Sequence, residues 1–147
     1  MEDCFICRKH REMPPEAVIY EDEMVIASHA APQADGQVYR GWCLIEPRRH
    51  APGLPDLTES EAERVGRLMA SLGRAMRDEL KAEHIYAFVL GHHAAHLHVH
   101  LLARYPGTPR QYWGQRLDEW PEAPKVNGAG IDLLVSRLKK RLEDKQT

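Results

Sequence analysis

The 147-residue sequence lacks a long apolar run, an excess of charge of either sign and a cysteine framework. No stretch approaches the roughly 18 apolar residues of a membrane span, and no basic start followed by an apolar segment marks a signal peptide. The net charge of -2 gives no broad attraction to nucleic acid or to an acidic membrane. These absences predict a cytoplasmic protein whose partner is a small molecule, with neither membrane nor nucleic acid as partner.

Cysteine is scarce, with three residues in the chain. An odd number without an export signal argues against disulfides and leaves metal binding or thiol chemistry for Cys4 and Cys7. Cys43 lies apart in an apolar run and is expected to be buried. The sequence also lacks internal repeats and low-complexity tracts, so we expect residues 1–147 to form a single domain.

Apolar periodicity predicts an α+β protein: an antiparallel sheet of about five strands, with a long central helix and a C-terminal helix on one side. Apolar runs at 18–20 and 24–27 predict a hairpin, and a strand is predicted over 38–46. A capping-box pattern at 58–61 opens the long helix, which continues to residue 80. Strands over 84–90 and 95–103 are predicted to be joined by a tight turn at 91–93, and a helix is predicted over 131–142.

Three histidines, His96, His98 and His100, alternate with apolar residues in the second of these two strands. Residues two apart on a strand share a face, so the three imidazoles are predicted to line one side of the sheet. Packing alone rarely explains such a row, because each imidazole brings a donor and an acceptor that must be matched when buried. A metal centre is the main alternative, but no carboxylate follows His100, and Arg104 suits a phosphate better than a dication.

This segment resembles the histidine triad (HIT) pattern, in which three histidines alternate with apolar residues and two more apolar residues follow. The stretch from Pro47 to His50 is similar to the family's Pro-(Lys/Arg)-x-His, and Cys4 to Cys7 is similar to its frequent N-terminal Cys-x-x-Cys. The resemblance covers residues 1–110 as a core, and 111–147 form a variable tail with the C-terminal helix. It implies a HIT-like fold and, by analogy, a homodimer.

The resemblance also implies a nucleotide substrate and a role for each histidine. His98 would attack the α-phosphorus of a dinucleoside polyphosphate or a nucleoside phosphoramidate, and water would cleave the nucleotidyl-histidine without a metal in the chemical step. His100 would hydrogen-bond phosphate oxygens or the leaving group, and His96 would brace the site. Related transferases carry Gln at the third position, so His100 favours hydrolysis. A nucleotidyltransferase and a nucleotide-binding protein with weak catalysis stay open as alternatives.

A zinc site is a second implication of the resemblance. Family members with the N-terminal cysteine pair complete a zinc shell with the histidine of the Pro-x-x-His stretch and the first triad histidine. In this chain the ligands would be Cys4, Cys7, His50 and His96, with His10 as a possible substitute. Such a closed shell would be structural and would leave His98 free.

The sequence departs from the family pattern at two substrate-contacting places. The loop before the triad is short, and His92 and His93 stand near positions from which members contact phosphate. Where members often place an Asp on the ribose hydroxyls, this chain has His29 followed by two alanines, and an imidazole cannot accept two hydroxyl hydrogen bonds as a carboxylate does. Candidate substrate contacts are therefore His29, His92, His93 and Arg104.

Overall fold

A five-stranded antiparallel sheet, with strand order β1-β2-β4-β6-β5, forms the centre of the molecule. The computed structural model describes residues 4–144. The strands are β1 (Val18–Glu21), β2 (Val25–His29), β4 (Trp42–Pro47), β5 (His84–Phe88) and β6 (Val99–Arg104). A second sheet pairs β3 (Gln37–Tyr39) with β7 (Lys125–Asn127). The predicted α+β architecture, with its antiparallel sheet of five strands, is confirmed.

Two long helices pack on one face of the sheet. Helix α2 (Glu59–Leu80) packs against β4, β5 and β6, and α3 (Gly128–Asp144) packs against β1 and α2. As predicted, α2 begins with a capping box, in which the Thr58 hydroxyl accepts from the Glu61 amide and the Glu61 carboxylate accepts from the Thr58 amide. Within residues 4–144, no helix is both long enough and apolar enough to cross a membrane.

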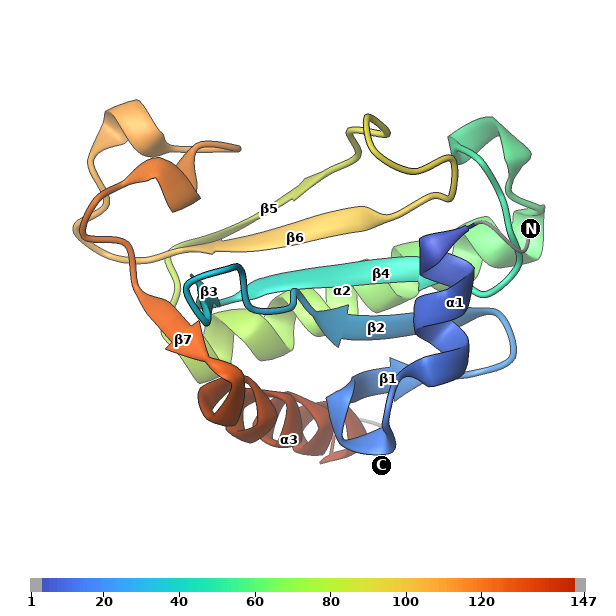
Figure 1. Ribbon diagram of the computed structural model, residues 1–147, viewed down its shortest axis with the longest axis horizontal. Helices are drawn as coiled ribbons and strands as arrows, with labels where there is room; N and C mark the ends of the chain where they lie inside the picture. Colours follow the sequence, from blue (N-terminus) through green and yellow to red (C-terminus); the bar gives the residue numbers. More distant parts are fainter. Residues whose placement is uncertain (1–3, 145–147) are drawn as a thin grey trace.

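Helix α1 (Phe5–Glu12) was not predicted, and it lies on the other face of the sheet (Figure 1). The two predicted helices, α2 and α3, share one face as expected, and α1 is an addition to the predicted architecture. The helix buries a single apolar residue, Ile6, and is otherwise mostly charged, so it has no apolar stripe for sequence periodicity to detect. Contacts from its thiols and charged side chains, described below, hold it on the sheet.

The strand predicted over 38–46 is two strands rather than one, because the chain bends at Arg40 and Gly41. Residues before the bend form β3 and leave the main sheet, whereas residues after it form β4. Gly41 has φ +89, and a Cβ there would lie 2.8 Å from a methyl of Leu80 and 3.0 Å from Cβ of Ala103. Glycine is required here both for the backbone conformation and for the close approach.

Strands β5 and β6 are neighbours, as predicted, but the predicted tight turn between them is wrong. Their pairing ends at Phe88 opposite His100, and residues 89–98 form a long loop. The end of this loop is bound elsewhere: the Leu97 amide donates to the Ala51 carbonyl at 2.7 Å. His96 therefore lies in a bend and His98 just before β6, and only His100 lies in the strand itself.

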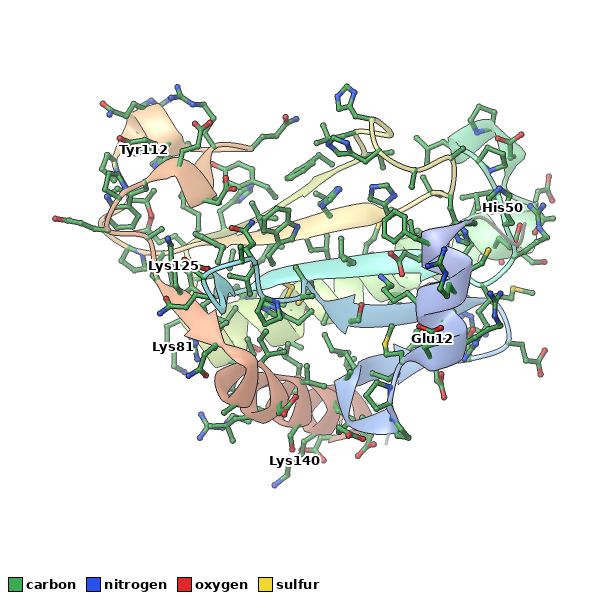
Figure 2. The ribbon with its side chains drawn as sticks, viewed as in Figure 1. Glu12, His50, Lys81, Tyr112, Lys125 and Lys140 are labelled. Carbon is green, nitrogen blue, oxygen red and sulfur yellow. The ribbon has the colours of Figure 1, made fainter. Side chains whose placement is uncertain are left out.

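The remaining elements are short 3-10 helices. They are η1 (Pro15–Ala17), η2 (Leu54–Asp56), η3 (Arg110–Tyr112) and η4 (Leu117–Glu119). The last two lie in the stretch after β6, and Leu117 from this stretch is fully buried in the core. Figure 2 shows Tyr112 of this stretch at the opposite end of the sheet from His50, which lies beside α1. The open face of the sheet thus lies between these two segments.

Candidate functional site

The histidines lie on the sheet face opposite α2. Strand alternation sends Ile45, Val99 and Leu101 into the core beneath α2. His100 points the other way, where it contacts Trp42 of β4 and Phe88 of β5. The packing of one face thus fixes the direction of the histidine on the other.

His98 has one nitrogen engaged and one nitrogen open. Its Nδ1 lies 2.8 Å from the carbonyl oxygen of His96. A carbonyl can only accept, so in the neutral ring the proton lies on Nδ1 and Nε2 carries a lone pair. The ring is half-buried and lies 5.0 Å, between centroids, from the ring of His100. This geometry presents an unprotonated imidazole nitrogen beside a second imidazole.

His100 is enclosed by aromatic rings. Phe88 stacks on it with centroids 4.9 Å apart, and the Trp42 indole N–H donates to its Nδ1 at 3.0 Å. Burial lowers the pKa of His100 to about 4, assisted by the charge of His98, while the Glu46 carboxylate opposes the shift. His100 is therefore neutral at physiological pH.

His96, fully buried, belongs to a cluster that can hold a metal. Its Nδ1 lies 3.4 Å from the sulfurs of Cys4 and Cys7, and His50 Nδ1 lies 3.6 Å from the Cys7 sulfur. The four ligand atoms all lie within 4.8 Å of one another. A tetrahedral zinc with ordinary Zn–S and Zn–N bonds separates sulfur and nitrogen by about 3.6 Å, so the donor set and its spacing fit a Cys2His2 shell.

The orientation of His96 supports the same fit. Its Nε2 lies 2.8 Å from the carbonyl of Pro47, so Nε2 carries the proton and Nδ1 faces the thiols with a lone pair. His10, the possible substitute ligand, instead places Nε2 3.0 Å from the Glu46 carboxylate. The structure thus brings together the four residues named from the sequence.

Glu46 is a site residue that the sequence analysis missed. It is 1% exposed on β4, and it accepts from Lys9 Nζ at 2.7 Å and contacts His10 at 3.0 Å. Burial by itself would raise the pKa of this carboxyl, but the hydrogen bond from His10 and the charge of Lys9 bring it below its ordinary value. A charged residue inside an apolar strand was the available signal. These contacts attach the second turn of α1 to the sheet.

His29 is buried, and both of its ring nitrogens are bonded to backbone. Its Nδ1 donates to the Ala30 carbonyl at 2.9 Å, and its Nε2 accepts from the amides of Gly41 and Trp42 at 3.1 and 3.3 Å. Burial lowers its pKa. The imidazole therefore supports the bend between β3 and β4, and any substrate contact would have to displace one of these bonds.

Arg104 lies in an aromatic cluster at the far end of the sheet. Its guanidinium carbon is 3.7 Å from the ring centre of Trp113, and its Nη1 donates to the Tyr86 hydroxyl at 2.7 Å. Arg110 lies 4.7 Å from the same Trp113 ring. Both arginines thus hold the stretch after β6 against the sheet.

His92 and His93 lie in the exposed loop between β5 and β6, with ring centroids 6.3 Å apart. Neither contacts His98 or His100 among the interactions of the described residues. The two histidines are therefore close to the triad in sequence but exposed on the surface. They would have a binding role only through contact with a bound ligand.

A groove of about 590 Å³ lies between α1 and the face of β2 and β4. Leu44, Ala30 and Ala31 form part of its sheet side, and Arg8 and Lys9 stand on its helical side. Leu44 pairs directly with His100 across β4 and β6, so the groove adjoins the histidines. The groove therefore lies one strand away from His100, with both basic and acidic side chains on its helical side.

Comparison with known proteins identifies the family. The HIT domain family model matches residues 10–107. The chain belongs to the HIT family. It is 28% identical over 109 residues to Protein hit of Bacillus subtilis strain 168, with 71% of this chain and 72% of that protein covered. Family membership supports a nucleotide-binding hydrolase or transferase of the HIT superfamily.

Solved structures show the same fold. A hypothetical histidine triad nucleotide-binding protein from Sulfolobus tokodaii has TM-score 0.73 at 19% identity, with 97% of this chain and 94% of that one covered. A Zn-bound histidine triad family protein from Mycobacterium smegmatis has TM-score 0.69 at 18% identity, covering 99% and 96%. A HIT family hydrolase from Clostridium thermocellum has TM-score 0.56 at 24% identity, covering 75% and 97%.

Proposed function

We propose that this protein is a nucleotidyl hydrolase that cleaves at the α-phosphate of dinucleoside polyphosphates or nucleoside phosphoramidates. The observation that carries the proposal is the bond between His98 Nδ1 and the His96 carbonyl, which leaves the Nε2 lone pair for attack. The similarity to the Clostridium thermocellum hydrolase supports hydrolysis over transfer.

The proposed reaction has two steps, and neither step changes an oxidation state. His98 Nε2 attacks the α-phosphorus, a P–N bond forms, and the bond to the leaving group breaks with its electron pair. The nucleotidyl-imidazole keeps its Nδ1 proton and its positive charge, stabilised by the His96 carbonyl. Water then attacks phosphorus, the P–N electron pair returns to Nε2, and a nucleoside monophosphate leaves as a proton passes to solvent.

The surrounding residues take supporting roles in this proposal. His100 hydrogen-bonds phosphate through Nε2, because its Nδ1 is occupied by Trp42. The nucleoside lies in the groove beside α1, with His92 and His93 reaching the distal phosphates from their loop. His29 and Arg104 contribute indirectly, by supporting the β3–β4 bend and the aromatic cluster.

We assign zinc to the Cys4, Cys7, His50 and His96 cluster, and the zinc-bound Mycobacterium smegmatis neighbour supports this choice of metal. When bound, the ion supplies a structural cross-link between α1 and the segment before β6. No step of the proposed chemistry uses it, because all four positions of a tetrahedral shell are filled by protein.

A homodimer formed along β5 completes the proposal. Strand β5 is an edge of the sheet, and a groove of about 580 Å³ separates it from the exposed side of α2. Gly66, Ala70 and Gly73 face this groove, and no atom lies within 4 Å of a Cβ built on either glycine. An unpaired edge beside a small-residue helix face suits a second copy of the chain.

The free cysteines accord with a cytoplasmic location.

The test is the release of nucleoside monophosphate from diadenosine triphosphate by His98→Ala. We expect kcat to fall by at least about 1,000-fold, since removal of a nucleophile leaves only binding and electrostatic effects. Lys140→Ala, at an exposed position on α3, is the control and should retain activity. Full turnover by His98→Ala would remove the proposed nucleophile. Faster transfer to added phosphate or sugar phosphate than to water would indicate a transferase instead.

A further inference from the structure

Trp42 contacts His100 through the one polar atom of its indole. The Trp42 Nε1–H lies 3.0 Å from His100 Nδ1, and an indole nitrogen can donate a hydrogen bond but cannot accept one. His100 Nδ1 must therefore carry a lone pair. The proton of the neutral ring lies on Nε2, the nitrogen that remains for the substrate.

The ring of His100 is also held in orientation. Phe88 stacks almost parallel to it, with an interplanar angle of 13°, and the Trp42 ring lies 5.8 Å away at 48°. Both contacts come from strands that pair with β6, because Phe88 is the cross-strand partner of His100 and Trp42 is that of Leu102. If the proton of the neutral His100 ring moved from Nε2 to Nδ1, it would face the indole N–H, and two hydrogen-bond donors would oppose each other.

These contacts oppose the imidazolium form. A proton on Nδ1 would face the Trp42 N–H directly and leave two donors without an acceptor. The titratable groups that act on His100 are His98 on its own segment and Glu46 on β4, whereas β5 presents the uncharged Phe88. Burial, the largest influence, favours the neutral ring and lowers its pKa to about 4.

We propose that Trp42 is a positioning residue that fixes His100 as a neutral Nε2–H hydrogen-bond donor. The site is thereby selective for leaving groups that depart as anions. This inference rests on the proposed nucleotidyl transfer to His98, and it chooses between the two substrate classes of that proposal. Phosphoanhydrides are the substrates, and phosphoramidates of ordinary amines are not.

The choice follows from where the electron pair goes. When the α-phosphorus bond of a phosphoanhydride breaks, the leaving phosphate keeps the pair as a stable anion, and a hydrogen bond from His100 suffices. When the P–N bond of a phosphoramidate breaks, the amine nitrogen must gain a proton because an amide anion is too basic to leave. A neutral His100 could supply that proton only by becoming an imidazolate, so the site lacks the general acid that this substrate needs.

The test compares two substrates that share the adenylyl group: diadenosine triphosphate and an adenosine 5′-phosphoramidate of an aliphatic amine. We expect the wild-type protein to favour the anhydride in kcat/KM by on the order of 100-fold, the lower end of a general-acid contribution. The decisive variant carries 3-benzothienylalanine at position 42, which keeps the shape of tryptophan and replaces the N–H with sulfur. Trp42→Phe is the simpler second variant, and Trp120→Phe in the tail is the control.

Removal of the N–H frees His100 Nδ1 to carry a proton, so the ring no longer has to present Nε2–H to the substrate, although burial still opposes the charged form. The anhydride preference should then fall about tenfold or more in both position-42 variants, mainly through kcat rather than KM, and stay unchanged in Trp120→Phe. An unchanged preference in the benzothienyl variant, or a wild-type preference for the phosphoramidate, would overturn the inference. If neither substrate forms an adduct on His98, the proposed function itself fails.

A readout independent of turnover accompanies the kinetics. In protein with 15N-labelled histidine, the wild-type His100 signal should show a protonated Nε2 and an unprotonated Nδ1 at pH 7. The benzothienyl variant should show a mixture of tautomers or the imidazolium. Wild-type protein with the proton on His100 Nδ1 would contradict the inference even if the kinetics agreed.

Discussion

At the scale of single residues, each of the three histidines takes its tautomer from one neighbour. The Pro47 carbonyl holds the proton on Nε2 of His96, and the His96 carbonyl holds it on Nδ1 of His98. In the sequence the three histidines look equivalent, because each alternates with an apolar residue. Their hydrogen-bond partners nevertheless make His96 a candidate metal ligand and His98 a candidate nucleophile. Chemically equivalent residues thus acquire different roles from a backbone carbonyl in two cases and from the Trp42 indole, which bonds to His100, in the third.

Because His100 is neutral in the folded protein, we expect the free energy of unfolding to decrease at acid pH. Its pKa is about 4 in the folded protein and about 6.5 in an unfolded chain, so below pH 6.5 the unfolded state binds more protons. The stabilisation is present above pH 6.5 and is lost as pH falls toward 4. The free energy of unfolding should decline by up to about 1.4 kcal/mol per pH unit within this window.

Urea unfolding of the wild type and of His100→Phe between pH 7 and pH 4 measures this contribution. The phenylalanine can still stack on Phe88 but has no proton to bind, so its stability curve should be flatter than that of the wild type. His84→Phe, at an exposed site, should keep the wild-type slope. Equal slopes for wild type and His100→Phe would show that His100 titrates normally.

At the scale of elements, α1 is held by chemistry rather than by apolar packing. Its N-cap Cys4 and its first-turn Cys7 supply the thiols that face His96, and its second turn supplies Lys9 and His10 to the buried Glu46. The helix also forms one wall of the groove beside the histidines. Loss of its attachment should therefore affect both stability and nucleotide binding.

Metal content should depend on the cysteine pair. We expect the wild type to bind about one zinc per chain and the Cys4→Ser/Cys7→Ser variant to bind none, as measured by elemental mass spectrometry. With zinc at 100 to 1,000 times its dissociation constant, its removal should lower the free energy of unfolding by roughly 3–4 kcal/mol. Cys43→Ala removes a buried thiol outside the cluster and should retain the metal. Zinc retained by the double variant would disprove the assignment.

Sequence periodicity predicts the elements that bury one apolar face, and it fails where tertiary contacts decide. Helix α2 shows the success: its cap and its apolar spacing are local features. The bend at Gly41 depends on neighbours distant in sequence, and so does the point at His100 where the pairing of β5 with β6 ends. The same reason hid Trp42, because its contact with His100 requires the register between β4 and β6.

The candidate metal ligands could be named in advance because they carry a recognisable pattern, whereas the signal for Glu46, a single charge in an apolar strand, does not identify its partners. A Cys-x-x-Cys and a Pro-x-x-His are visible without coordinates, and the structure brings both to His96. Glu46 acquires its partners only because α1 crosses the end of β4 (Figure 1). An unpredicted helix necessarily leaves its contacts unpredicted.

At the scale of the whole molecule, the open sheet face is bounded by α1 at one end and by the stretch after β6 at the other (Figure 2). The core beneath the sheet fixes the directions of side chains above it. The proposed second copy would add its own edge at β5, away from the α1 groove. Each chain would then keep one complete set of histidines.

The proposed dimer can be tested with a bulky charge on the α2 face. Gly73→Arg should convert the protein to monomers in sedimentation equilibrium, since the side chain would fill the groove beside β5. Ser71→Arg, on another side of the same helix, is the control and should leave the assembly unchanged. A wild-type monomer at tens of micromolar, or a dimeric Gly73→Arg, would contradict this interface.

The central claim is that His98 carries the nucleotidyl group between substrate and water. The most direct test is mass spectrometry of protein that is quenched with a non-acidic denaturant within the first turnover of diadenosine triphosphate. We expect an adenylyl adduct on the peptide containing residues 96–104, located on His98 by fragmentation and absent from His98→Ala. Release of nucleoside monophosphate with no adduct at any quench time, or with the adduct on another residue, would contradict it.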